Sequence, residues 1–154
     1  MTQITTHFSE AEFTASGTAA RRGINNSLPD ALRAAALETC QMMERIRRYL
    51  SDRKGKEIAI IVTSGYRCLA LNRAIGSSDT SDHVRALAMD FKAPGFGSPF
   101  EVCEALAPRV SDLAIGQLIH EFGAWVHVST RMPDKRVNRI ITIKNDGTHV
   151  GIVP

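Results

Sequence analysis

Polar and apolar residues follow a helical period in the first third of the chain. Over residues 30–51, leucine, alanine, methionine and isoleucine recur at near-helical spacing, which is typical of one face of an α-helix. The Lys-Gly-Lys run at residues 54–56 ends this stretch. Ser9 and Glu12 form a capping-box pattern that predicts a short helix near the N-terminus. Residues 14–30 are rich in Gly, Asn, Ser and Thr, so we expect a loop there.

The middle of the chain combines short strands with short helices. Residues 57–67 contain a nearly continuous apolar run, which predicts a strand buried on both faces. Residues 86–93 predict a second strand by their apolar character. Helices are expected at residues 68–76 and at residues 98–108, where Ser98 suits the N-cap and a proline follows it.

The C-terminal part predicts two β-hairpins. Residues 117–130 form two alternating runs around a central glycine, and residues 139–153 form two more around Asn-Asp-Gly at 145–147, which supplies a turn. Helices that come first, followed by strands interrupted by short helices, favour an α+β fold. In it, a mainly antiparallel sheet has the N-terminal helices packed on it. A length of 154 residues suits a single domain, 1–154.

The composition is that of an ordinary globular protein, with 44% hydrophobic and 23% charged residues. No apolar run approaches the ~18 residues that a membrane span needs, so we expect no membrane partner. The first residues also lack a basic segment followed by an apolar one. We therefore expect no signal peptide and synthesis in the cytoplasm.

Charge and cysteine content narrow the function further. A net charge of +3 and a pI of about 9.0 allow attraction to an anionic polymer but identify none. No dense Lys/Arg tract is present, so we expect no nucleic-acid partner. Cys40, Cys68 and Cys103 are widely spaced and form no CxxC motif. We expect reduced, mostly buried thiols that bind no metal.

Two histidines and one aspartate are candidate metal ligands. His83 and Asp90 lie seven positions apart, and Asp90 is a charged residue in an otherwise apolar strand. A buried carboxylate is costly unless it is paired or bound to a metal. His127 lies between two valines in another predicted strand. Two imidazoles and one carboxylate match a catalytic zinc site, but an ordinary hydrogen-bonded pair of His83 and Asp90 is the alternative.

Several short motifs extend this pattern along the chain. They are Ser64-Gly65-Tyr66-Arg67, Asn72, Gly76, Ser81-Asp82-His83, Ala88, Asp90 and Trp125-Val126-His127, in that order. With the opening HFSEAEF and TAARRGINN, they resemble the D-Ala-D-Ala carboxypeptidase and phage endolysin family of LAS-type zinc peptidases. The resemblance covers most of residues 7–130 and implies a hedgehog/D-Ala-D-Ala peptidase-like fold.

The resemblance also implies roles for individual residues. Zinc (Zn²⁺) would be held by His83, Asp90 and His127. Arg67 would bind the substrate or steady the polarised carbonyl, because arginine stays charged and offers a fork of donors. The substrate-binding residues expected from these motifs are Arg67, Ser81 and Tyr66, although for Ser81 a plain turn role is an equal alternative. The family usually has glycine where this chain has Ala86, and alanine suits that position only if its φ is negative.

No motif of the resemblance gives the general base directly. Many members of the family carry an acid three positions before the last histidine, where this chain has Ala124. If residues 122–124 form a three-residue hairpin loop, Glu121 lies on the same face of neighbouring strands as His127. A two-residue loop would place His120 opposite His127 instead. We prefer Glu121 as the catalytic base that takes the proton from water.

These expectations describe a zinc metallopeptidase that hydrolyses peptide bonds in peptidoglycan stem peptides or cross-links. It would act as a D,D- or L,D-type carboxypeptidase or endopeptidase, as a monomer, on a peptidoglycan peptide substrate. A phage or prophage lysis enzyme that reaches the cell wall through a holin, or in a virion, would fit. The alternative is a catalytically weakened zinc-containing module that binds the wall, which the missing acid at Ala124 favours.

Overall fold

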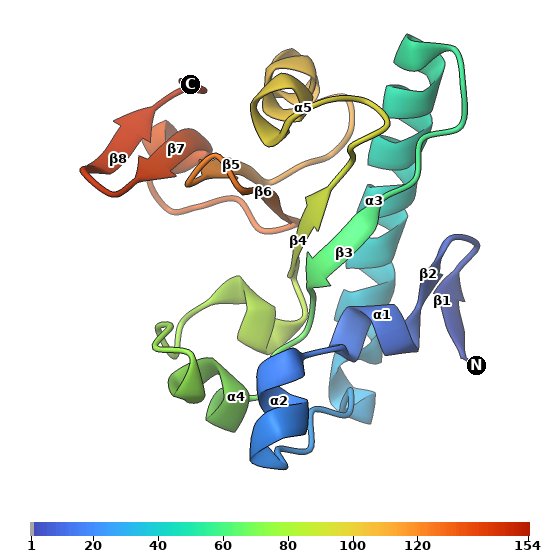
Figure 1. The fold of residues 1–154 in the computed structure, drawn as a ribbon, viewed down its shortest axis with the longest axis vertical. Helices are drawn as coiled ribbons and strands as arrows, with labels where there is room; N and C mark the ends of the chain where they lie inside the picture. Colours follow the sequence, from blue (N-terminus) through green and yellow to red (C-terminus); the bar gives the residue numbers. More distant parts are fainter. Residues whose placement is uncertain (1) are drawn as a thin grey trace.

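The computed structural model describes residues 2–154 (Figure 1). Its helices are α1 (Glu10–Thr14), α2 (Gly17–Arg22), α3 (Arg33–Lys54), α4 (Leu69–Ala74) and α5 (Pro99–Leu106). Its strands are β1 (Gln3–Thr5), β2 (Phe8–Ser9), β3 (Ile61–Ser64), β4 (Ala88–Lys92), β5 (Gln117–Glu121), β6 (Trp125–Ser129), β7 (Ile140–Lys144) and β8 (Gly147–Val150). Short 3-10 turns occur at Asp30–Leu32, Asp82–Arg85, Ala107–Arg109 and Arg136–Asn138.

A six-stranded sheet in the order β3-β4-β6-β5-β7-β8 organises the fold. Its neighbouring strands are antiparallel except for the parallel pair β5 and β7. One hydrophobic cluster joins α3 and α5 to the inward side chains of β4, β5 and β6. Figure 1 shows the long helix α3 running beside β3 and β4, with α5 near the C-terminal end of β4. The expected α+β fold with a mostly antiparallel sheet is confirmed.

Local sequence signals account for most element boundaries. Ser9 caps α1 and Ser98 caps α5, each in a capping box with a glutamate three residues later. Gly55 ends α3 in the left-handed conformation (φ 71°), which glycine adopts without steric cost. In the hairpin of β7 and β8, Lys144 pairs with Gly147, so Asn145 and Asp146 form the predicted turn.

Two predictions about the first half of the chain were wrong. The segment 14–30 is not all loop, because α2 forms within it. The Ser16 hydroxyl caps this helix by accepting from the Ala19 amide, and Gly23 ends it. In the segment 57–67 only β3 is a strand, and it lies at the sheet edge with Ile61 half exposed. Exposed and partly buried residues alternate along it, so β3 is not buried on both faces.

The β5–β6 hairpin has the register that the three-residue loop predicts. Glu121 pairs with Trp125, and Ile119 pairs with His127. Because side chains alternate along a strand, Glu121 and His127 point to the same face of the sheet. The two-residue alternative, with His120 opposite His127, is wrong. Within residues 2–154, no helix has the length and apolar character to cross a membrane.

Candidate metal centre

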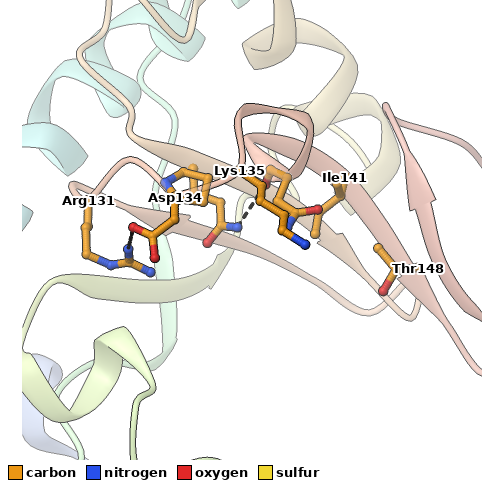
Figure 2. Close-up of a pocket in the computed structure, with 8 residues that line it drawn as sticks. Arg131, Asp134, Lys135, Ile141 and Thr148 are labelled. Carbon is orange, nitrogen blue, oxygen red and sulfur yellow. Dashed lines mark hydrogen bonds and ion pairs between the residues drawn. The ribbon is translucent and has the colours of Figure 1, made fainter.

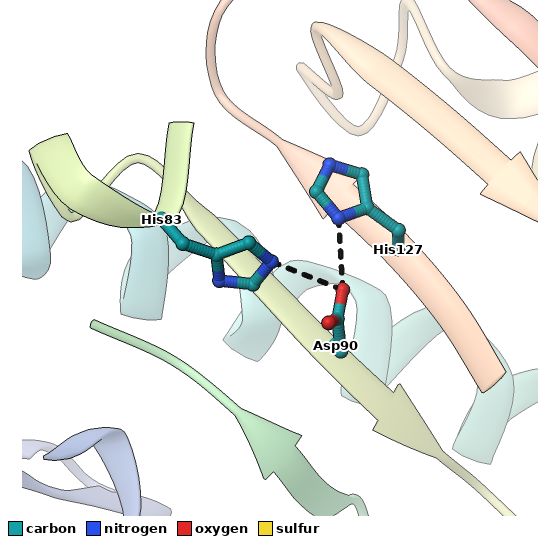
Figure 3. Close-up of side chains that lie close together, drawn as sticks. All are labelled: His83, Asp90 and His127. Carbon is teal, nitrogen blue, oxygen red and sulfur yellow. Dashed lines mark hydrogen bonds and ion pairs between the residues drawn. The ribbon is translucent and has the colours of Figure 1, made fainter. Parts of the chain in front are cut away.

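Three side chains from separate segments converge on one face of the sheet (Figure 3). His83 lies in the turn before β4, Asp90 in β4 and His127 in β6. Asp90 Oδ1 lies 3.2 Å from His83 Nε2 and 2.8 Å from His127 Nδ1. One potential ligand atom from each residue lies within 4.8 Å of the others. Asp90 and His127 are directly paired across β4 and β6, so the sheet register itself brings them together.

The orientation of His83 is set by a backbone carbonyl. Its Nδ1–H donates to the carbonyl oxygen of Gly65 at 2.6 Å, because a carbonyl can only accept. The other ring nitrogen, Nε2, is therefore left with its lone pair toward Asp90, as second-shell partners arrange in metal sites. Gly65 itself has to be glycine, because a Cβ there would collide with the carbonyl oxygen of Phe13.

The electrostatics of the three residues suit a divalent cation. Burial raises the pKa of the Asp90 carboxyl, but the neighbouring His83 and His127 outweigh burial and lower it overall. Burial lowers the pKa of His83. Burial also acts to lower the pKa of His127, but its hydrogen bond to Asp90 raises it overall. A carboxylate and two imidazole nitrogens form the donor set that catalytic zinc sites use, so the residues fit this metal.

The turn that carries His83 is anchored by Asp82. This buried carboxylate accepts from the Ser129 hydroxyl at 2.8 Å, from Arg131 Nε at 2.8 Å and from Arg85 at 3.1 Å. The contacts tie the His83 turn to the end of β6 and to the chain beyond it. Sequence reasoning gave Asp82 no role, because two of its partners, Ser129 and Arg131, lie more than 40 positions away and leave no local signal.

Ala86 has the conformation that we expected only of glycine. Its φ is 59°, in the left-handed region, so the condition of a negative φ is not met. The strained backbone is held in place, since the Thr39 hydroxyl of α3 donates to the Ala86 carbonyl oxygen at 2.7 Å. The turn after His83 therefore keeps a shape typical of glycine despite the alanine.

Glu121 lies beside the cluster. Its Oε1 is 3.8 Å from His127 Nδ1, as the shared sheet face requires. Burial raises the pKa of the Glu121 carboxyl above its ordinary value, toward neutral pH.

Burial lowers the pKa of Arg67, while the negative charges of Asp90 and Glu121 oppose this effect. Both carboxylates therefore favour the charged form of the Arg67 guanidinium.

The Arg67 side chain is held by three polar groups. Its Nε donates to Asn72 Oδ1 at 3.0 Å, and its two terminal nitrogens donate to the hydroxyls of Ser64 at 3.2 Å and Ser81 at 3.5 Å. Asn72 is fully buried and also donates to the Ser78 carbonyl oxygen at 2.7 Å. The hydrogen bonds to Ser64, Asn72 and Ser81 therefore orient the Arg67 guanidinium.

Comparison with known proteins assigns the family. A family model described as Peptidase M15 matches residues 6–129. This chain belongs to the Peptidase M15 family. Membership indicates a peptidase, dependent on zinc, that acts on peptidoglycan-type substrates. The match ends with β6, so it includes His83, Asp90, His127, Glu121 and Arg67 and leaves Arg131, β7 and β8 outside. No curated protein matches the chain.

The surroundings of Tyr66 in this M15 peptidase differ from those of Arg67 and Ser81. Its side chain is 6% exposed and packs in the hydrophobic cluster. Its backbone is clamped, because Tyr66 N–H donates to the Phe13 carbonyl oxygen and the Asn26 amide donates to the Tyr66 carbonyl oxygen. Asn26 also accepts from the Cys68 amide at 2.7 Å. Tyr66 therefore contributes to the site by fixing the backbone next to Arg67.

His120 and the cysteines lie away from the cluster. His120 points to the opposite sheet face, where its Nδ1–H donates to the Val153 carbonyl oxygen at 3.0 Å. Burial raises the pKa values of Cys40 and Cys103 to about 12, so both thiols stay neutral. The Cys68 sulfur accepts from the Leu71 amide at the start of α4. The three cysteines are free, as predicted.

Proposed function

We propose that this chain is a zinc metallopeptidase that hydrolyses peptide bonds in peptidoglycan stem peptides or their cross-links, with residues 1–154 as one peptidase domain. One observation carries the proposal. His83, Asp90 and His127 converge within 4.8 Å, and Glu121 lies 3.8 Å from His127 on the same sheet face. A metal-binding set with a carboxylate beside it is the arrangement that metal-assisted hydrolysis needs.

In this proposal His83 Nε2, an Asp90 oxygen and His127 Nδ1 hold the zinc. When bound, zinc acts as a Lewis acid that lowers the pKa of a water molecule to about 7 and polarises a carbonyl oxygen. The protein supplies orientation: the Gly65 carbonyl fixes the His83 ring, and the pairing of β4 with β6 fixes Asp90 against His127.

Glu121 is the proposed general base. It accepts a proton from water as the water oxygen bonds to the scissile carbonyl carbon. It then donates this proton to the leaving nitrogen as the C–N bond breaks. Its raised pKa supports the role, because a base and acid works best with a pKa near the operating pH.

Arg67 is the proposed partner of the substrate carbonyl or carboxylate. Its three hydrogen bonds hold the guanidinium in one orientation, so little conformational entropy is lost when a substrate oxygen binds. We propose Ser81 as a positioning residue, since its hydroxyl contacts Arg67 and also accepts from the His83 backbone amide at 3.3 Å. In this arrangement Arg67 contacts the substrate, whereas Ser81 acts through Arg67.

The test uses purified peptidoglycan and a matched pair of substitutions. Glu121→Gln should lower the rate of peptide-bond hydrolysis by about 10²–10⁴-fold while the zinc content stays unchanged. Glu104→Gln, on the exposed side of α5, should leave the rate unchanged. Full activity of Glu121→Gln would remove Glu121 as the base. Absence of zinc after reloading would overturn the whole proposal.

The products of the same reaction define the finer activity. Release of single D-alanine residues would indicate a carboxypeptidase, whereas loss of cross-linked species would indicate an endopeptidase. We further propose a lysis role for a phage or prophage, in which a holin releases the enzyme to the wall or a virion carries it there. Cell lysis that depends on co-expression of a holin would test the first route.

A second function is favoured by one feature, the alanine at position 124. If Glu121 does not replace the acid expected there, the zinc site would be retained in a module that binds the wall without turnover. Such a module would contain about one zinc per chain and sediment with peptidoglycan, yet release no peptide from walls of different chemistry. Hydrolysis of any of these walls would exclude it.

A further inference from the structure

A cavity lies in the C-terminal part of the molecule (Figure 2). It has a volume of about 460 Å³ and lies between the segment 130–139 and the strands β5, β7 and β8. Arg131, Asp134, Lys135, Ile141 and Thr148 are among its lining residues, and we call it the β7 pocket. Its volume falls within the range of small-molecule and peptide sites.

The β7 pocket opens on the same sheet face as the metal cluster. Ile119 pairs with His127 on one side and with Ile141 on the other, so the three side chains form a row across β6, β5 and β7. Neighbouring strands lie ~4.8 Å apart, which places Ile141 about 10 Å from His127. An extended peptide advances roughly 3.3–3.6 Å per residue, so this distance corresponds to about three residues of a bound substrate.

The charges around the β7 pocket favour an anion. Arg131 uses its Nε to bind Asp82, and one terminal nitrogen lies 3.9 Å from Asp134, whose side chain is fully exposed. Lys135 makes no ion pair with any residue in 2–154. Figure 2 shows its side chain extending between Asp134 and Ile141. Arg131 is therefore compensated by its acidic partners, and Lys135 is the lining cation that is free to attract an anion.

The floor and wall of the β7 pocket suit a peptide rather than a free ion. Ile141 is buried and offers an apolar floor, and Thr148 adds a hydroxyl on the neighbouring strand. The Gln117 amide donates to the Asn138 carbonyl oxygen at 2.9 Å, which ties the segment 130–139 to β5. The mix of apolar surface and a few polar groups is typical of ligand sites.

We propose that the β7 pocket is a substrate subsite that binds a carboxylate-bearing part of the peptide, about three residues from the bond that is cleaved. This inference rests on the proposed peptidase function and specifies its substrate. Lys135 is the residue that recognises the carboxylate. It lies beyond the region 6–129 that the family model matches, so the subsite belongs to this chain's own C-terminal part.

The experiment compares two synthetic peptides that differ by one charge. The probes are L-Ala-γ-D-Glu-L-Lys-D-Ala and the same peptide with the D-Glu α-carboxylate amidated. Binding is measured by calorimetry on the full chain loaded with zinc and carrying Glu121→Gln, so that any hydrolysis is suppressed. The acid form should bind about fivefold more tightly than the amide, and added salt should reduce this preference.

Lys135→Gln tests the assignment, and Lys144→Gln is its matched control. Lys144 lies on β7 but alternates to the opposite sheet face from Ile141. In Lys135→Gln the acid and amide peptides should bind with about equal affinity, whereas in Lys144→Gln the preference for the acid peptide should persist. Neither substitution removes a buried contact, so both variants should keep their fold and zinc content.

Equal affinity for the two peptides, no measurable binding of the acid form, or a preference that survives Lys135→Gln would each overturn the subsite. The outcome is separate from that of the proposed function. If the wild-type chain hydrolyses peptidoglycan without discriminating the peptides, only the subsite fails. If the preference depends on Lys135 and no wall is hydrolysed, the pocket binds the peptide carboxylate but the peptidase proposal fails.

Discussion

The two faces of the β5–β6 hairpin each carry one buried histidine, and their surroundings differ. On one face, His127 Nδ1 lies 2.8 Å from Asp90 Oδ1 and 3.8 Å from Glu121 Oε1. On the other, His120 lies under α5 with the Phe100 ring 5.7 Å away, and its Nε2 has no hydrogen-bond partner among residues 2–154. One face therefore gathers titratable groups, and the other is part of the packed interior.

The comparison teaches that register, more than residue type, decides the chemistry of a histidine. Strand alternation sends residues of even and odd number to opposite faces. A one-residue slip of β5 against β6 would have turned His120 to the face of the cluster, opposite His127, and Glu121 away from it. The three-residue loop at 122–124, with Phe122 and Gly123 both at positive φ, sets that register.

The largest expected effect comes from replacing each of the two histidines in turn. His127→Ala should lower zinc affinity by at least about 100-fold and abolish hydrolysis, because it removes one of three proposed ligands. His120→Ala should keep about one zinc per chain and lose only about 1–3 kcal/mol of stability through lost packing. Elemental analysis and thermal unfolding of the two variants would measure both effects. Equal zinc loss in the two variants would contradict the division between the faces.

An intermediate effect is expected at the support of the metal face. Asp82→Asn should weaken zinc binding by about tenfold, because it disturbs the contacts that hold the His83 turn to Ser129 and Arg131. The control is Asp79→Asn, an exposed residue in the preceding loop whose main partner is Arg73. Competition with a chromophoric chelator would report the affinities. Unchanged zinc affinity in Asp82→Asn would show that the turn holds its shape without this carboxylate.

The smallest effect concerns two buried alanines next to the site. Ala86→Gly relieves a left-handed strain of about 1–2 kcal/mol, which offsets the loss of a buried methyl and the added freedom of the unfolded chain. Ala88→Gly in β4 relieves no such strain. We expect Ala86→Gly to be more stable than Ala88→Gly by about 1 kcal/mol in urea unfolding of the zinc-free proteins. The reverse order would mean that Ala86 is not left-handed in solution.

Much of the fold could be predicted because its signals are local. Capping boxes at Ser9 and Ser98, the apolar period of α3 and the turn at 145–147 each depend on neighbours a few positions away. The edge position of β3 could not be predicted, because a strand's neighbours are chosen by the whole sheet. Helix α2 was overlooked because polar and glycine residues outweighed the cap at Ser16.

For the site, the sequence by itself determined which residues we propose to carry the chemistry: His83, Asp90, His127, Glu121 and Arg67. The resemblance of the motifs to the zinc peptidases gave the ligands and Arg67, and strand alternation in the hairpin gave Glu121. Only the tertiary structure decided how these groups are held, through contacts such as those of Asp82, and that the β7 pocket shares their sheet face. Such partners meet across 40 or more positions, so pairing of distant strands, not local pattern, brings them together.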